Sequence, residues 1–143
     1  MRAHLFRSLP LFVFLFLACF ALASELTLIP AGSIWRYNDQ GQDLGPPSDW
    51  AVLSYDDSAW STGTAPLGYG DDWHTGDHII SYGDDPNNKY PCYYFRHTFL
   101  VDDLSYFESL VVRFVRDDGC VIYLNGEEIA RSNMPSGEIT YST

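Results

Sequence analysis

The sequence predicts an all-β protein built as an antiparallel β-sandwich. No long segment repeats its apolar residues with the 3.6-residue period of a helix, and short β-type runs separated by Gly, Pro, Asn and Asp dominate instead. Asn125-Gly126 splits "CVIYLNGEEIAR" into two such runs, and Asn-Gly accepts the positive φ angles of a type I′ hairpin turn. Strands joined by short turns pair antiparallel, and two such sheets bury their apolar faces against each other.

The first half of the chain contains short strands between turns. "LTLIP" and "SIWRYN" are expected strands, and "GQDLGPPSDW" is an expected loop because Pro46-Pro47 cannot join a sheet ladder. "WAVLSYDDSAW" predicts a short strand or turn leading into an Asp-Asp-Ser turn, and "APLGYG" precedes a long acidic loop.

The second half contains the clearest strand patterns. "CYYFRHTFL" and "SLVVRFVR" alternate between two faces, and "VDDLSYFESL" predicts one helical turn capped by Asp102 or Asp103. Arg96 and Arg113 lie inside these apolar runs. They could clamp a ligand, but an ion pair or strand-face contact with Asp117 or Asp118 is favoured.

Residues 1–23 have the order of a secretory signal peptide. Arg2 and Arg7 precede an apolar run, and Ala21-Leu22-Ala23 is a small-x-small cleavage site, so cleavage before Ser24 is expected. Lipoprotein processing at Cys19 is the disfavoured alternative. The mature protein, residues 24–143, is therefore expected to be secreted or held at the cell surface, without membrane insertion after cleavage.

The mature chain is strongly acidic. Cleavage leaves six basic against nineteen acidic residues, a net charge of −13. Such a surface repels phosphate backbones and anionic lipids, so binding to nucleic acid or to a membrane surface is not expected. Fourteen of the acids are Asp, mostly beside turn-forming residues, and acidic turns can also hold Ca2+ outside the cell.

The loop "GYGDDWHTGDHIISYGDDP" concentrates these acids. His74 and His78 would share a helix face, but Gly76 argues against a helix, so a catalytic metal site is not expected. The loop is interpreted first as a solvated surface loop. The second interpretation is a Ca2+ site that uses some of four aspartates: Asp71, Asp72, Asp84 and Asp85.

Other chemistry has little support. The chain has no Gly-x-Ser-x-Gly elbow and no Gly-rich phosphate loop, and no spacing singles out a pair of glycosidase carboxylates. This chain alone is therefore not expected to be an enzyme. Export permits a disulfide between Cys92 and Cys120, but the sequence does not show that they are adjacent, so bridged and free thiols both stay open.

Aromatic residues offer a binding surface. Trp73, Tyr82 and Tyr90 lie in or beside the acidic loop, where they could stack on sugar rings while Asn87 and Asn88 bind hydroxyls. Six other aromatics are interpreted as core residues: Trp35, Trp50, Trp60, Tyr93, Phe95 and Phe114.

Four ordered motifs, "WAVLSYDDSAW", "APLGYGDD", "DPNNKYPCYYFRHTF" and "RDDGCVIYLNGEEIARSNMP", resemble the galactose-binding-like jelly-roll module of large secreted bacterial proteins. There the module accompanies metallophosphoesterase, spore-coat-kinase-like, lamin-tail or glycosidase domains. A more distant likeness is to the sugar-binding domain of β-galactosidases. The resemblance covers about Leu26 to Thr143 and implies further strands after Tyr141, so we expect a domain without its last strands, in a fragment of a longer reading frame.

Three functions follow from these expectations. The first is an exported, non-catalytic accessory module that recognises a polysaccharide or cell-surface glycan, alongside further domains of the same polypeptide. The second is the N-terminal fragment of an extracellular metallophosphoesterase or glycosidase whose catalytic domain lies beyond residue 143. The third is a structural spacer or adhesion module without a small ligand.

Overall fold

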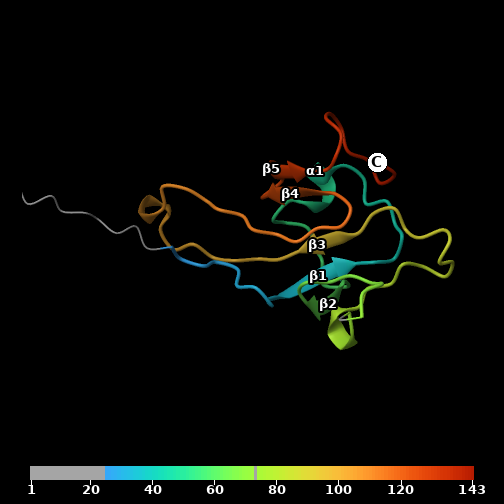
Figure 1. Cartoon of the computed structure of the whole chain (residues 1–143). Coiled ribbons are helices and arrows are strands. Elements are labelled where there is room, and N and C mark those ends of the chain that lie inside the picture. Colours follow the sequence, from blue (N-terminus) through green and yellow to red (C-terminus); the bar gives the residue numbers. More distant parts are fainter. Residues whose placement is uncertain (1–24, 73) are drawn as a thin grey trace, which may run out of the picture.

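The computed structural model describes residues 25–72 and 74–143, which form two antiparallel sheets (Figure 1). Strands β1 (Ile34–Asn38), β2 (Ser61–Thr64) and β3 (Tyr94–Arg96) make a sheet of order β2-β1-β3. Strands β4 (Cys120–Leu124) and β5 (Glu127–Ser132) make the second sheet. The prediction of a β-rich, antiparallel protein is confirmed at this level.

Helical structure in the described residues is limited to single turns. They are α1 (Pro47–Trp50) and the 3-10 turns η1 (Gly76–His78) and η2 (Leu104–Tyr106). Asp103 caps η2 by accepting a hydrogen bond from the Ser105 backbone N–H, as the sequence predicted for one of two candidate aspartates. Within the described ranges, no helix has the length and apolar content needed to cross a bilayer.

The Asn125-Gly126 hairpin is confirmed. Leu124 pairs with Glu127 across a two-residue turn, in which Asn125 has φ 52° and Gly126 has φ 90°. Positive φ at both central residues is the requirement of a type I′ turn. Farther along the ladder the register shifts between Ile122 and Tyr123, which is typical of a β-bulge.

Several expected elements are wrong. Residues 109–116 do not form a strand, and the strand expected over residues 92–100 is limited to Tyr94–Arg96. The loop around Pro46-Pro47 contains α1, because Pro47 stands in the first turn of the helix, where no backbone N–H is needed. Strand β2 was missed because "STGT" has no apolar alternation. "LTLIP" is not a strand either.

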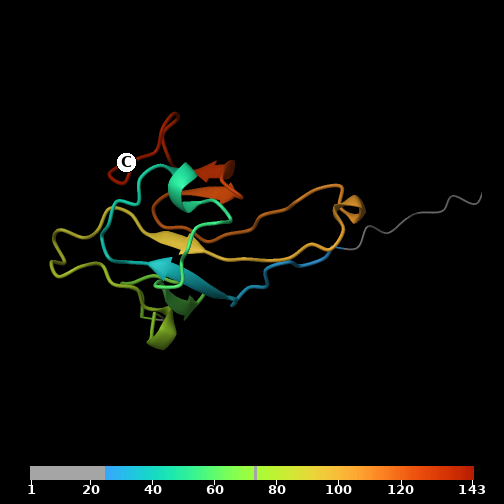
Figure 2. The same ribbon diagram turned by 180° about the vertical axis from the view of Figure 1, so that it is seen from behind.

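Residues 97–118, called the arm below, leave the body of the molecule as one long excursion with η2 at its tip. Figures 1 and 2 show the arm and the loop around residues 82–92 extending from the two sheets in opposite directions.

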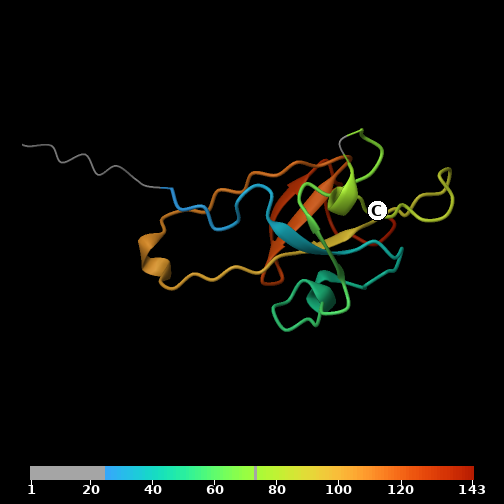
Figure 3. The same ribbon diagram turned by 90° about the horizontal axis from the view of Figure 1, so that it is seen from below.

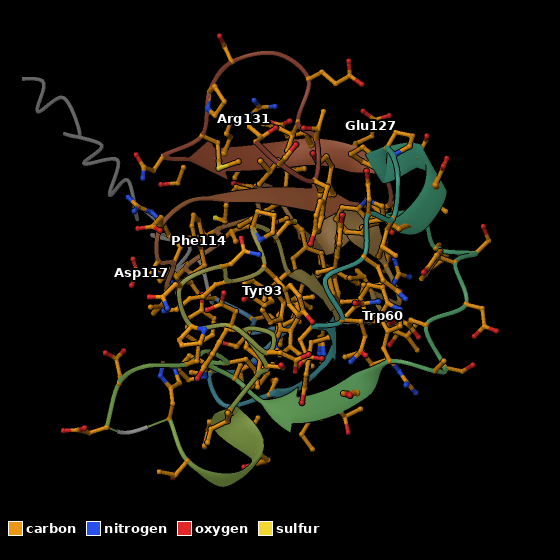
Figure 4. The ribbon with its side chains drawn as sticks, turned by 90° about the vertical axis from the view of Figure 1, so that its right-hand side faces the viewer. Trp60, Tyr93, Phe114, Asp117, Glu127 and Arg131 are labelled. Carbon is orange, nitrogen blue, oxygen red and sulfur yellow. The ribbon has the colours of Figure 1, made fainter. Side chains whose placement is uncertain are left out.

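The core is small and is centred on aromatic contacts between the sheets. The Trp50 ring meets Tyr94 of β3 at 4.9 Å and Tyr123 of β4 at 5.6 Å between ring centroids, both edge-on. Tyr94 is only 6% exposed, and Trp60 lies 6.5 Å from its ring. Figure 4 shows Trp60 and Tyr93 between the two layers of strands.

Two predicted core residues are not in the core. Phe95 is 38% exposed and Phe114 is 42% exposed. Phe95 lies on the sheet face opposite Tyr94, and Phe114 belongs to the arm, which the described elements leave uncovered. Of the aromatic contacts, those of Trp50 with Tyr94 and Tyr123 join the two sheets.

Candidate functional site

The acidic loop does not gather its carboxylates at one point. Asp71 and Asp72 lie beside η1. Asp84 and Asp85 lie in the loop around residues 82–92, called the projecting loop below, and Figures 1 and 3 both show these two regions apart. Among the described residues, no group of three or more His, Cys, Asp or Glu side chains is arranged to hold a metal ion. Asp85 instead accepts a hydrogen bond from the Asn87 backbone N–H at 2.8 Å, which is turn chemistry. The Ca2+ site stays a prediction.

The two loop histidines face different partners. The His74 ring packs on the Gly68 backbone, where an added Cβ would lie 2.5 Å from Nε2, and its Nδ1 is 3.8 Å from Asp71. His78 Nδ1 lies 2.8 Å from the carbonyl oxygen of Thr64. Asp77 accepts a hydrogen bond from Thr64 Oγ1, and this bond lowers the pKa of its carboxyl. These contacts fasten η1 to β2.

The aromatic binding surface was predicted from Trp73, Tyr82 and Tyr90, and its two described rings, Tyr82 and Tyr90, pack against other residues of the protein. The Tyr82 ring lies edge-on to Tyr69 at 5.3 Å, and Tyr69 contacts Tyr93 at 5.8 Å. Lys89 Nζ lies 4.8 Å from the Tyr69 ring centre and 5.5 Å from that of Tyr82, so its ammonium group occupies the place of a stacking ligand. Burial raises the pKa of Tyr93. Trp73 lies outside the described residues.

Tyr90 serves as an anchor for the base of the projecting loop. The Tyr90 ring packs so closely on Gly41 that it leaves no room for a Cβ there. The Tyr90 backbone N–H donates to the Tyr82 carbonyl at 3.1 Å. Asn87 and Asn88 are exposed at the loop end. The binding roles predicted for these residues stay predictions. The Tyr82 ring contacts Tyr69 and Lys89, and the Tyr90 ring packs on Gly41.

Cys92 and Cys120 are both free thiols. The bridge that the sequence left open is therefore not formed in this structure. Burial raises the pKa of both thiols, which favours their neutral form and not a reactive thiolate.

The β2-β1-β3 sheet carries an unusual polar row. Arg36 of β1 pairs with Thr62 of β2 on one side and with Arg96 of β3 on the other. Like charges directly opposite each other destabilise a sheet unless they are neutralised. Asp57 supplies the neutralisation: its Oδ2 lies 2.9 Å from Arg96 Nε and its Oδ1 lies 3.3 Å from Arg36 Nε.

Arg96 uses its guanidinium for bonds within the protein. Its guanidinium also donates to the carbonyl oxygens of Trp50 and of Val52, so one side chain fixes both ends of the turn that follows α1. The sequence favoured an ion pair for this arginine and named the wrong acids. Its partner is Asp57, and Arg113 forms an exposed 3.7 Å pair with Glu25.

Arg36 has a guanidinium donor, Nη2, that can still donate a hydrogen bond to a ligand. Its Nη1 donates to the Asp57 carbonyl at 3.2 Å, whereas its Nη2 makes no hydrogen bond or ion pair with the described residues, and its side chain is 42% exposed. A guanidinium with one unoccupied edge beside a carboxylate can donate to a ligand hydroxyl or carboxylate.

A pocket of about 300 Å3 lies beside Arg36, where β1 begins and β3 ends. The β1–β3 register, continued by one residue, places Trp35 opposite His97, and their rings lie 5.1 Å apart at 33°. His97 Nδ1 is 3.0 Å from the Ile34 carbonyl oxygen, which sets the orientation of the imidazole. The pocket is lined by Ile34, Trp35, Arg36, Asp57, Thr62, Arg96, His97 and Thr98.

This lining combines an aromatic surface with hydrogen-bonding groups. The indole of Trp35 lines the pocket from one face of β1, whereas the guanidinium of Arg36 and the hydroxyl of its partner Thr62 line it from the other face. Ligand pockets in proteins usually measure about 300–1,000 Å3 and pair apolar walls with a few polar groups. At about 300 Å3, the pocket lies at the lower end of this range.

Sequence reasoning missed this pocket. Trp35 was interpreted as a core residue, and Thr62 stands in a strand without an apolar pattern. The alternation in "SIWRYN" puts Trp35 and Arg36 on opposite faces of one strand, so this pattern does not indicate that both line one pocket. The pairing of Trp35 with His97 depends on a long-range register that one sequence does not contain.

No protein-family model, no curated protein and no solved structure matches the chain. The resemblance to the galactose-binding-like module therefore rests on the sequence motifs alone.

Proposed function

We propose that this protein is an exported, non-catalytic recognition module that binds carbohydrate of a polysaccharide or cell surface. We further propose that its sheets belong to a galactose-binding-like jelly roll. Support for export comes from the signal-like order of residues 1–23, and support for the fold class comes from the two antiparallel sheets.

The observation that carries the proposal is the Trp35 pocket. Sugars present a C–H face that stacks on indole and hydroxyls that take hydrogen bonds from charged and hydroxyl side chains. Trp35 supplies the first kind of surface with the His97 imidazole beside it, and Arg36 and Thr62 supply donors that line the pocket from the other sheet face. The projecting loop with Asn87 and Asn88 is the second candidate surface, and its tyrosine rings are already covered.

A binding role suits the site better than catalysis. The carboxylate in the pocket, Asp57, is paired with Arg36 and Arg96, so both of its oxygens are engaged by side chains of the protein. A glycosidase needs a second carboxyl group facing the first across the substrate. The other described lining residues, Ile34, Trp35, Thr62, His97 and Thr98, include none.

Calorimetric titration with a panel of plant, algal and bacterial polysaccharides, with and without Ca2+, tests the proposal. A shallow site of this kind predicts a dissociation constant on the order of 0.1–1 mM, roughly −4 to −5.5 kcal/mol. Trp35→Ala should weaken binding by about fivefold to thirtyfold, since stacking contributes about 1–2 kcal/mol.

Tyr106→Ala is the matched control. Tyr106 is an aromatic residue 82% exposed at the tip of the arm, so its loss should leave binding unchanged. Near-ultraviolet circular dichroism shows whether each variant keeps its fold. A folded parent protein that ignores every glycan would replace the recognition proposal with the spacer function.

A further inference from the structure

The returning limb of the arm, residues 108–116, is an unpaired strand sequence. Within the described structure no backbone hydrogen bond engages these residues. Their apolar side chains are largely uncovered: Leu110, Val111, Val112 and Phe114 are all exposed, and Val115 is 85% exposed. An extended, apolar segment with free N–H and C=O groups is a template for pairing with another chain.

The sequence of the limb is complementary to itself. In an antiparallel pair centred on Val112, that residue faces its own copy and Leu110 faces Phe114 of the second copy. Glu108 then faces Arg116 of the second copy, and symmetry repeats each contact. All five residues fall on one strand face, which becomes an apolar surface with an ion pair at either end.

Neighbouring registers are worse. A shift that pairs Val112 with Arg113 places Glu108 opposite Asp117, and these like charges repel. A shift that pairs Arg113 with its own copy sets two guanidinium groups against each other. Of these three registers, the Val112-centred one alone joins opposite charges and matches apolar residues.

The intramolecular contacts of the limb are compatible with this pairing. Arg113 lies on the other face and reaches Glu25 of the N-terminal segment at 3.7 Å. Arg116 donates to Ser132 Oγ at 3.0 Å and to the Asp118 carbonyl at 2.7 Å, which holds its guanidinium at the base of the arm. Glu108 makes no ion pair within the described residues, so it can approach Arg116 of a second copy.

We propose that two copies of this chain associate through antiparallel pairing of residues 108–116 about a two-fold axis at Val112. Burial of Leu110, Val112 and Phe114 drives the association, because apolar area removed from water is its main favourable term. The ladder hydrogen bonds and the Glu108–Arg116 pairs select the register. This interface is separate from the Trp35 pocket, so it does not depend on the proposed ligand.

Analytical ultracentrifugation of the purified protein over a concentration series tests the proposal. The expected result is a monomer–dimer equilibrium. Val112→Asp places two carboxylates face to face at the axis and should raise the dimer dissociation constant by more than about tenfold. Val115→Asp adds the same charge on the other strand face, opposite Ser109, and should have a smaller effect.

Disulfide trapping tests the register. Under mild oxidation Val112→Cys should form an intermolecular 112–112 bridge, whereas Val115→Cys should not bridge to itself, because the two copies of residue 115 lie at opposite ends of the ladder. Peptide mass mapping separates these products from any involving Cys92 or Cys120. A monomer at all concentrations, a dimer insensitive to Val112→Asp, or equal trapping at both positions would overturn the proposal.

Discussion

Arg36 and Arg96 lie directly opposite each other on adjacent antiparallel strands, and the single carboxylate of Asp57 holds both. Arg96 uses its remaining donors to fix the turn after α1, whereas Arg36 keeps one edge free beside the Trp35 pocket. The ion-pair cluster therefore stabilises the fold and lies beside the pocket proposed to bind a ligand.

Removing the charge of Asp57 should destabilise the fold. In Asp57→Asn the two guanidinium groups face each other without a counter-charge, and we expect a loss of about 2–3 kcal/mol, below the full cost for a fully buried pair. Urea unfolding measures it. Asp56→Asn is the control: Asp56 is exposed and caps only the Ser58 turn. Equal losses in the two variants would contradict a special role for Asp57.

Tyr94 should make the fold sensitive to alkali. Burial raises the pKa of its phenol to about 12, against about 10 in the unfolded chain. Below pH 10 both states hold the proton. Between pH 10 and 12 only the folded state keeps it, so stability should fall by up to about 1.4 kcal/mol per pH unit. Urea midpoints at pH 8, 10 and 11 follow this loss.

Tyr94→Phe separates the two roles of that residue. The phenol oxygen accepts a hydrogen bond from the Leu44 backbone N–H at 3.3 Å, so the variant should be about 1 kcal/mol less stable at pH 8. Its stability should then decline less than that of the parent above pH 10. Parallel declines would show that other groups, such as Tyr93, control the alkaline loss.

The hairpin turn should not tolerate a β-branched residue. Gly126 has φ 90°, so Gly126→Val forces a strained backbone at a cost on the order of 1–3 kcal/mol. Asn125→Gly, which keeps the positive φ accessible, is the matched control and should stay close to the parent. A Gly126→Val protein with an unchanged unfolding midpoint would contradict the type I′ turn.

Export predicts a defined N-terminus. Mass analysis of material secreted by an expressing cell should show a chain that begins at Ser24, because Ala21-Leu22-Ala23 suits signal peptidase. A lipidated Cys19, or a retained apolar segment, would contradict this cleavage.

Local chemistry could be predicted from the sequence, and long-range contacts could not. Asn125-Gly126 and the Asp103 cap follow from residues close in the chain, and both are confirmed. Whether residues 109–116 form a strand depends on a partner strand, and the described residues supply none. The Trp35–His97 contact and the shared Asp57 likewise depend on the register of β1 against β3. That register is set by packing far along the chain.

Indole N–H resonances in a 1H–15N correlation spectrum test the proposed glycan-binding site most directly. The chain has four tryptophans, Trp35, Trp50, Trp60 and Trp73, which give four such signals. During titration with a glycan that binds, the Trp35 signal should shift progressively while those of Trp50 and Trp60, which pack against Tyr94 in the core, stay in place. A shift confined to Trp73, or four unmoved signals at saturating glycan, would contradict the Trp35 pocket as the binding site.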